Sequence, residues 1–187
     1  MSPNDAPFFT KGSHVMVDIE TLSTRTDATI TSIGACKFNF VSGITGTFKV
    51  NIDPKDSVKY GTHISTDTVE WWKKQPKEAV RGWTTNPQPL KESLIEFRDW
   101  LGVSKQTLWC KGLSFDFPII GMSFSLIGEH KPWSHYQEMD LRTLFKVLNI
   151  DSAMREQSEN DVTYHDALGD SIRQAKQLIS LFDIEAF

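Results

Sequence analysis

The first part of the chain has three stretches rich in apolar, β-branched and aromatic residues, and the third of them clearly alternates apolar and polar positions. This period of two is typical of β-strands that bury one face. Gly43 marks a turn, and the connections between the stretches are short, so we expect an antiparallel meander. The predicted strands are His14–Glu20, Thr31–Phe40 and Ile44–Ile52.

Apolar residues then recur at the spacing of helices. Asp67 and Glu70 have the spacing of a capping box and predict a short helix, which Pro76 ends. A short apolar stretch at Thr107–Cys110 predicts a buried strand. Four further helices are predicted, from Pro89 to Leu101, from about Asp116, from about Asp140 to Leu148 and from about Asp166 to Phe182.

Three strands followed by mixed strands and helices predict an α/β or α+β sheet covered by helices. The chain has no internal repeat and no evident linker, so we expect residues 1–187 to form one domain, with 1–12 as a loose lead-in. Residues 151–161 (DSAMREQSEND) are polar and lack an apolar period. They predict a loop that is poorly ordered without substrate.

The composition is that of an ordinary globular protein, with 39% hydrophobic and 24% charged residues and a net charge of −4. This acidity excludes a general electrostatic attraction to nucleic acid, but it is compatible with a site that collects carboxylates to bind cations. No apolar run approaches the roughly 20 residues of a bilayer span, and the N-terminus lacks a secretory pattern. Cys36 and Cys110 lie far apart in sequence. We therefore expect no membrane association and a reducing, cytoplasmic compartment.

Two carboxylates lie at the end of the first predicted strand. Because side chains at i and i+2 point to the same face of a strand, Asp18 and Glu20 project side by side. Two adjacent like charges cost free energy unless a cation compensates them. An isolated Asp-x-Glu is more often a turn cap beside a solvated carboxylate, so the pair alone does not define a metal site.

Three later residues extend this chemistry. Asp116 lies at a strand-to-helix junction, where an N-cap is the ordinary interpretation. Asp170 lies within the last predicted helix, where a solvated helix face is the ordinary interpretation. His165 precedes Asp170 by five residues, which places the two about 140° apart around a regular helix. His165 is therefore expected to approach from the loop or first turn, as suits a general base better than a fixed metal ligand.

Together these residues resemble the motifs of the DEDDh, or DnaQ-like, 3′–5′ exonucleases. Asp-Ile-Glu on the first strand, Ser-Phe-Asp in the middle of the chain and His-x4-Asp at the last helix occur in the same order. The resemblance implies a ribonuclease-H-like fold, in which the antiparallel meander is followed by parallel strands and helices flank the mixed sheet. The stretches VEWWKKQ (69–75) and WCKGLSFDFPI (109–119) are further similar to the DexA-type exodeoxyribonucleases of T-even phages.

The resemblance implies a site for two Mg²⁺ ions, for which Mn²⁺ can substitute, since both prefer hard oxygen ligands. Asp18 would bridge both ions, and Glu20 and Asp170 would help to hold the one that carries the attacking water. Asp116 would support the second ion. His165 would accept a proton from the water, because imidazole exchanges protons near neutral pH. The product would be a nucleoside 5′-monophosphate.

Four residues near these motifs are candidates for substrate contact. Thr21 and Leu22 follow the acidic pair and resemble positions where relatives touch the terminal nucleotide, although ordinary turn residues fit equally well. Neighbouring helix residues lie about 100° apart, so one of Trp71 and Trp72 is expected in the core. The other can stack on a base or form a dimer contact, and Trp72 is our candidate. Lys111 could reach a phosphate of the substrate.

Four basic residues also lie beside the tryptophan pair, and a solvated helix face and a phosphate-guiding role fit them equally well: Lys73, Lys74, Lys77 and Arg81. The chain departs from the family pattern in the run Glu20-Thr21-Leu22-Ser23, where many members have an ETTG-like turn with Gly shortly after the acidic pair, and at Gly112, where many DnaQ-type members carry Asn. Both changes bear on how the terminal nucleotide is held.

Three functions fit these residues. The leading one is a 3′–5′ exonuclease that acts on the 3′ end of single-stranded DNA, in the cytoplasm of a bacterium or of a phage-infected host. An exoribonuclease on short or 3′-terminal RNA would use the same five catalytic residues, and contacts to the 2′ position would distinguish it. The third is a proofreading-type accessory subunit that acts with a partner protein. Related enzymes are often dimers, so the resemblance also leaves a homodimer open.

Overall fold

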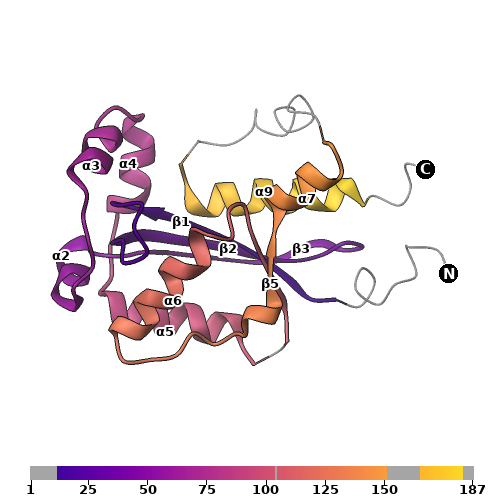
Figure 1. Ribbon diagram of the computed structural model, residues 1–187, viewed down its shortest axis with the longest axis horizontal. Helices are drawn as coiled ribbons and strands as arrows, with labels where there is room; N and C mark the ends of the chain where they lie inside the picture. The colour runs from indigo at the N-terminus through magenta and orange to yellow at the C-terminus, as the bar shows by residue number, and fades with distance from the viewer. Residues whose placement is uncertain (1–11, 104, 151–164, 183–187) are drawn as a thin grey trace.

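The computed structural model describes residues 12–103, 105–150 and 165–182. In these ranges a central five-stranded sheet lies between two helices on one side, α9 and α7, and two on the other, α5 and α6 (Figure 1). The remaining helices, α2 to α4, lie together at one end of the sheet (Figure 1). The loop expected at 151–161 and nearly all of the lead-in expected at 1–12 lie outside the described residues.

The sheet has the strand order β3-β2-β1-β4-β5. The first three strands pair antiparallel in chain order, and β4 then adds parallel to β1 and β5 parallel to β4. This arrangement confirms the predicted meander followed by parallel strands. The bounds are β1 His14–Thr21, β2 Ile30–Asn39, β3 Gly43–Asn51, β4 Thr107–Cys110 and β5 Glu138–Asp140.

The alternation along β1 divides its side chains between two cores. Val15, Val17 and Ile19 are buried against α5 (Leu90–Leu101) and α6 (Asp116–Leu126). Met16 is buried on the opposite face, in the core that α7 (Leu141–Val147) and α9 (Ala167–Leu181) complete. Because Asp18 and Glu20 follow Met16 at steps of two, they lie on the face that α9 covers.

Helices α2, α3 and α4 lie at the end of the sheet where β1 ends (Figure 1). The predicted short helix before Pro76 is present as α3, and a further helix, α4, follows that the sequence pattern did not predict. Ala79 is buried and Val80 and Trp83 pack partly buried beside it, so a short apolar stripe was the signal by which α4 could have been found. The bounds are α2 Pro54–Ser57, α3 Thr66–Trp72 and α4 Lys77–Thr84, with single 3₁₀ turns at Val58–Tyr60 and His135–Gln137.

A row of three residues crosses the sheet beneath the start of α9. Gly34 of β2 pairs with Asp18 of β1 on one side and with Lys49 of β3 on the other. A Cβ atom at Gly34 would lie 2.1 Å from the backbone carbon of Ala167, so only glycine lets α9 come this close. The absence of a side chain at Gly34 thus sets how near the acidic side chains of α9 can come to those of β1.

Among the described helices, none is both long enough and apolar enough to span a lipid bilayer.

Candidate active site

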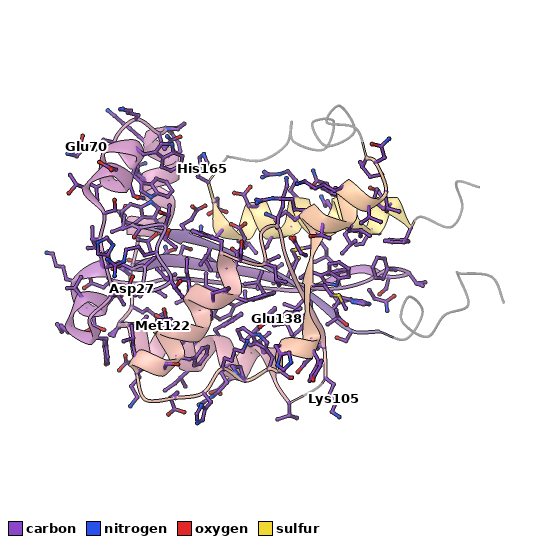
Figure 2. The ribbon with its side chains drawn as sticks, viewed as in Figure 1. Asp27, Glu70, Lys105, Met122, Glu138 and His165 are labelled. Atoms are coloured by element: carbon purple, nitrogen blue, oxygen red, sulfur yellow. The ribbon has the colours of Figure 1, made fainter. Side chains whose placement is uncertain are left out.

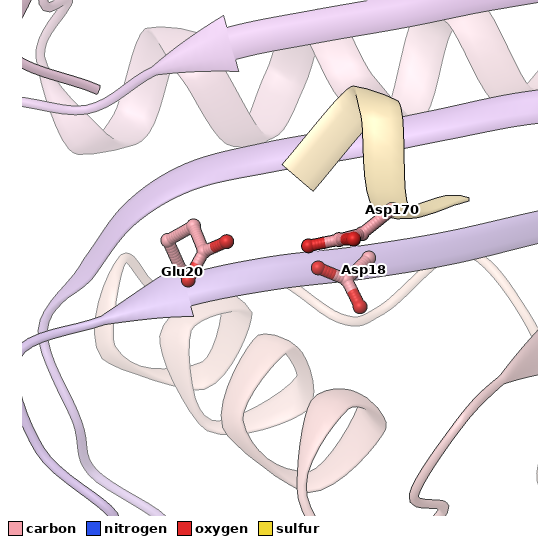
Figure 3. Close-up of side chains that lie close together, drawn as sticks. All are labelled: Asp18, Glu20 and Asp170. Carbon is pink, nitrogen blue, oxygen red and sulfur yellow. The ribbon is translucent and has the colours of Figure 1, made fainter. Parts of the chain in front are cut away.

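Three carboxylates meet where the end of β1 passes under the first turns of α9. One ligand oxygen from each of Asp18, Glu20 and Asp170 lies within 4.8 Å of the others (Figure 3). The side chains of Asp170 and Glu20 are buried, with 7% and 8% exposed, while Asp18 is half-buried. A solvated helix face does not describe Asp170, because the close approach of α9 to β2 places it over the sheet.

The fourth predicted carboxylate, Asp116, is the first residue of α6 and is 5% exposed. It lies outside the tight group of three. Among the neighbouring charges, however, that of Asp116 contributes most to raising the pKa of Asp18. Hydrogen bonds from the backbone of Asp116 itself and of Ile19 hold its carboxylate beside the end of β1. Asp18 therefore lies close to all three of the other carboxylates.

Burial and mutual repulsion make this cluster costly to ionise. Burial, followed by the charges of Asp170, Asp166 and Asp116, raises the pKa of Glu20 to about 8. Burial raises the pKa of Asp116 to about 7, and burial with the neighbouring carboxylates raises the pKa of Asp18 well above its ordinary value. Bound cations would remove this penalty, and the donors are all carboxylate oxygens, which suit Mg²⁺ or Mn²⁺. The residues thus fit a divalent metal site.

The start of α9 is anchored by charged and polar contacts. Asp166 caps the helix by accepting a hydrogen bond from the backbone N–H of Gly169 over 3.0 Å, and it forms an ion pair with Lys49 of β3. Arg173 forms an ion pair with Asp170 one turn further along. These contacts tie both ends of the first two turns of α9 and so hold Asp170 over β1.

A further contact joins the two elements that carry the carboxylates. The side-chain amide of Gln174 donates a hydrogen bond to Oδ1 of Asp18 over 2.8 Å, and this bond lowers the pKa of Asp18 against the effect of burial. Gln174 is 4% exposed and lies four residues after Asp170, so both side chains leave the same face of α9. Sequence reasoning missed Gln174, although its i, i+4 spacing from Asp170 was a usable signal.

His165 lies outside α9, which begins at Ala167, in agreement with the prediction from its spacing to Asp170. Its backbone is left-handed, with φ of 63°, which turns the chain sharply before the helix starts. The imidazole meets the ring of Trp71 edge to face, with centroids 4.8 Å apart, and lies between α9 and helices α3 and α4 (Figure 2). The predicted base therefore stands at the rim of the site.

A cavity of about 470 Å³ opens beside the carboxylates, between the end of β1 and α3. Glu20 and Thr21 line one wall, and Trp71 and Phe115 supply aromatic surface. Trp71 is 42% exposed. An open cavity with aromatic walls that borders a carboxylate cluster has the size and chemistry to receive one nucleotide.

The residues predicted to contact the substrate differ in whether they line the cavity. Thr21 lines the cavity, whereas Leu22 does not and is buried against Trp72 and Ala79. Trp72 also lines the cavity, but it is only 4% exposed and its indole N–H donates to the carbonyl of Thr21 over 2.9 Å, so Trp72 forms a buried part of the cavity wall. The prediction that one tryptophan of the pair is buried is confirmed, and Trp71 is the one that offers a free face.

Lys111 follows β4 directly and is half-buried, and its carbonyl accepts a hydrogen bond from the side chain of Arg142 over 2.8 Å. Of the basic residues beside the tryptophan pair, Lys73 follows α3 directly and forms an ion pair with Glu70 of that helix, and Arg81 is on α4. Lys49 was not predicted as part of the site, since nothing in its local sequence indicates that the fold brings it to Asp166.

The fold and the carboxylate arrangement define a 3′–5′ exonuclease of the DEDDh type. The model of the 3′–5′ exoribonuclease Rv2179c-like domain family matches residues 13–181, and the chain belongs to this family. A curated relative, the exodeoxyribonuclease of Enterobacteria phage T4, is 25% identical over 161 residues, which cover 71% of this chain and 70% of the phage protein. The resemblances inferred from the motifs are thereby confirmed.

Solved structures with the same fold include the nuclease domain of 3′hExo, a DEDDh family member bound to rAMP, with a TM-score of 0.64 at 13% identity and 90% of each chain covered. The zinc-bound complex of E. coli ExoI with single-stranded DNA matches with a TM-score of 0.68 at 13% identity and covers 91% of this chain. The chain spans about two-fifths of the exonuclease I chains that it matches, at 41% and 39% of their lengths. These likenesses confirm the ribonuclease-H-like fold.

Proposed function

We propose that the protein removes nucleoside 5′-monophosphates one at a time from the 3′ end of single-stranded DNA, with two divalent metal ions, Mg²⁺ or Mn²⁺, bound at the carboxylates. The observation that carries this proposal is the meeting of Asp18, Glu20 and Asp170 within 4.8 Å beside a nucleotide-sized cavity. The aromatic side chains in the wall of this cavity could stack on the base of the terminal nucleotide while its phosphate lies at the carboxylates.

Each carboxylate has a distinct place in this proposal. Asp18, which lies close to the other three, would contribute to both ions, Glu20 and Asp170 would hold one, and Asp116 would support the other. When bound, the ions supply the charge that activates water and stabilises the leaving oxygen. Gln174 would keep one oxygen of Asp18 oriented by its hydrogen bond.

His165 would accept the proton of the attacking water as the bond between the phosphorus and the 3′ oxygen of the preceding nucleotide breaks. Its place outside α9, next to the exposed ring of Trp71, supports this assignment, because a base at the rim can reach a water above the carboxylates. The shortened strand then carries a new 3′-hydroxyl.

The terminal nucleotide would occupy the cavity between β1 and α3. Thr21 lines this cavity and would contact the sugar, while Trp71 offers the larger exposed face for stacking on the base. Trp72 would act by holding the carbonyl of Thr21 in place rather than by direct stacking. Leu22 would contribute only if its side chain left the small apolar cluster where it lies, and Lys111 would meet a phosphate at the end of β4.

The preference for DNA rests on the similarity to the exodeoxyribonuclease of phage T4, which extends over 71% of the chain. RNA is the second candidate substrate, because the matching family is described as an exoribonuclease domain. Ser65 and Asp67 line the cavity and could accept a hydrogen bond from a ribose 2′-hydroxyl. We further propose that the protein works in the cytoplasm of a bacterial or phage-infected cell, either as a homodimer or with a partner protein.

The test uses 5′-labelled DNA and RNA strands of identical sequence, incubated with the protein and Mg²⁺ or Mn²⁺. A ladder that shortens from the 3′ end, on DNA faster than on RNA, is expected, with nucleoside 5′-monophosphates as product. EDTA and the Asp18→Asn variant should abolish it. Faster cleavage of RNA would overturn the preference for DNA, and no cleavage of either strand by the isolated protein would favour the accessory-subunit hypothesis.

A further inference from the structure

A second cavity, of about 430 Å³, lies between the turn after β4 and the start of α7. We propose that it binds a backbone phosphate of the strand on the 5′ side of the scissile bond, a proposal that rests on the function proposed above. We call it the Arg142 cavity. Its lining includes Gly112, Ser114, Asp140, Arg142, Thr143 and Lys146.

The chemistry of the Arg142 cavity suits a phosphate. The side chains of Arg142 and Lys146 are exposed, and Ser114 and Thr143 add hydroxyl groups. Among the described residues, the guanidinium of Arg142 makes one hydrogen bond, to the carbonyl of Lys111, so further N–H donors face the cavity. Lys146 forms no ion pair with the described residues.

The one carboxylate in this lining offsets one of the two positive charges, and its oxygens already accept hydrogen bonds from α7. The two oxygens of Asp140 accept from the backbone N–H groups of Arg142 and Thr143, over 3.2 and 3.3 Å, and from the hydroxyl of Thr143 over 2.6 Å. Asp140 thus serves as the N-cap of α7. The positive side chains of Arg142 and Lys146 remain to meet an anionic ligand.

The position of the Arg142 cavity follows the path that a bound strand would take. The turn between β4 and α6 lines both cavities, since Phe115 borders the nucleotide cavity and Gly112 and Ser114 border the Arg142 cavity. Asp116 lies at the end of this turn, where its backbone N–H donates to the carbonyl of Gly112 over 3.4 Å, so the turn joins the carboxylates to the lining of the Arg142 cavity. A strand with its last nucleotide beside Trp71 and its scissile phosphate over the carboxylates would continue toward Arg142.

Gly112 explains how the turn accommodates the arginine. Its φ of +146° lies in the region that side chains rarely adopt, and a Cβ atom there would lie 3.4 Å from Nη2 of Arg142. Gly112 is also the position where many DnaQ-type members carry Asn. The guanidinium of Arg142 therefore lies directly against the turn, and the backbone conformation of Gly112 is what favours glycine there.

The experiment compares two substrates, a single-stranded oligonucleotide of 12 residues and the p-nitrophenyl ester of thymidine 5′-monophosphate, which has no nucleotide on the 5′ side. For Arg142→Ala and for Lys146→Ala, we expect the ratio of kcat/KM on the oligonucleotide to kcat/KM on the ester to fall about tenfold. Lys105→Ala is the matched control, because Lys105 is exposed and far from α7 (Figure 2), and should leave the ratio unchanged.

A binding measurement in EDTA makes the test independent of catalysis. Fluorescence anisotropy of the same oligonucleotide should show weaker binding by both variants, and the slope of log K against log salt should become shallower by about 0.7 for each charge removed. An unchanged ratio together with an unchanged slope would overturn the Arg142 cavity as a phosphate site. Equal losses on oligonucleotide and ester would overturn it as well, since the side chains would then act on the carboxylates.

Failure of the proposed function would look different. In that case the wild-type protein would hydrolyse neither the oligonucleotide nor the ester with Mg²⁺ or Mn²⁺. The anisotropy measurement would still decide whether Arg142 and Lys146 bind the strand. Arg142→Lys is expected to restore part of the salt slope but less of the affinity, because a lysine keeps the charge and loses the planar pair of donors.

Discussion

Gln174 of α9 donates a hydrogen bond to Asp18 of β1 over 2.8 Å, and this contact links the two elements that carry the clustered carboxylates. The amide fits an ionised carboxylate as acceptor, and it offers no charge of its own. Because Gln174 and Asp170 leave the same face of α9, one helix both supplies a proposed metal ligand and orients the proposed ligand of another element.

Replacing Gln174 with Met should weaken metal binding by about 10–100-fold, since the apolar side chain keeps the volume but loses the amide that orients Asp18. The measurement is the rise in Tm of the protein on titration with Mn²⁺, which requires no substrate. Lys176→Ala, at an exposed position of the same helix, is the control. If the Met variant binds Mn²⁺ as tightly as the wild type, Gln174 does not orient Asp18 for metal binding.

Gly34→Ala should destabilise the protein by about 1–3 kcal/mol and lower activity, because a Cβ atom would collide with the backbone of Ala167 and push α9 off the sheet. For a chain of this size the Tm should fall by about 2–4 °C for each kcal/mol. Gly46→Ala is a matched control, since a Cβ atom at Gly46 would meet nothing closer than 4.0 Å. Equal Tm values for the two variants would contradict the close packing.

The sequence sufficed to predict the strands and helices whose apolar periods were regular, and the motif residues on them. Asp18 and Glu20 were placed on one face by the period of two alone, and His165 was placed outside the last helix by its angular separation from Asp170. What the sequence could not supply were contacts between elements distant in the chain. The pairing of Lys49 with Asp166 depends on the sheet register, which no local pattern encodes.

The tryptophan pair shows the same limit within a single helix. The 100° separation of neighbours predicted that one ring is buried, but it did not indicate which one. The choice depends on Thr21, whose carbonyl accepts from the indole of Trp72, and on α4, which covers Trp72 and was not predicted. That residues 1–187 form a single domain stays a prediction.

His165→Ala should reduce kcat by about 10²–10⁴-fold while leaving the Mn²⁺-dependent rise in Tm unchanged, because a general base contributes to the chemical step and not to metal binding. His135→Ala is the control of the same residue type, at an exposed position in the 3₁₀ turn before β5. A variant at His165 that loses metal binding together with turnover would show that the imidazole is a ligand instead.

Trp71→Ala should raise KM for single strands by roughly 5–150-fold, the range expected for the loss of one aromatic stacking partner. Trp71→Phe should recover most of this loss, since a smaller ring keeps the stacking face. Steady-state kinetics on the oligonucleotide separate two roles for the ring. If kcat falls and KM is unchanged, Trp71 acts by supporting His165, whose imidazole it contacts at 4.8 Å, rather than by binding a base.

The metal-free protein should lose stability as the pH rises from about 4 to about 8. The pKa of Glu20 is raised from 4.5 to about 8 and that of Asp116 from 3.8 to about 7, so the folded protein keeps protons that the unfolded chain releases. The stabilisation is therefore complete below the unfolded pKa values and disappears as the pH passes the folded ones. Tm measured in EDTA across this range should decline.

Glu20→Gln should flatten this decline and raise the Tm of the metal-free protein at pH 8 above that of the wild type, because the amide has no proton to release. Glu96→Gln, on the exposed face of α5, should change neither. Saturating Mn²⁺ should stabilise the wild type more at pH 8 than at pH 6, since cations bind the ionised carboxylates, and should stabilise the Glu20 variant less. A wild-type Tm in EDTA that rises between pH 5 and 8 would mean that the carboxylates ionise without cost, which is incompatible with their burial beside one another.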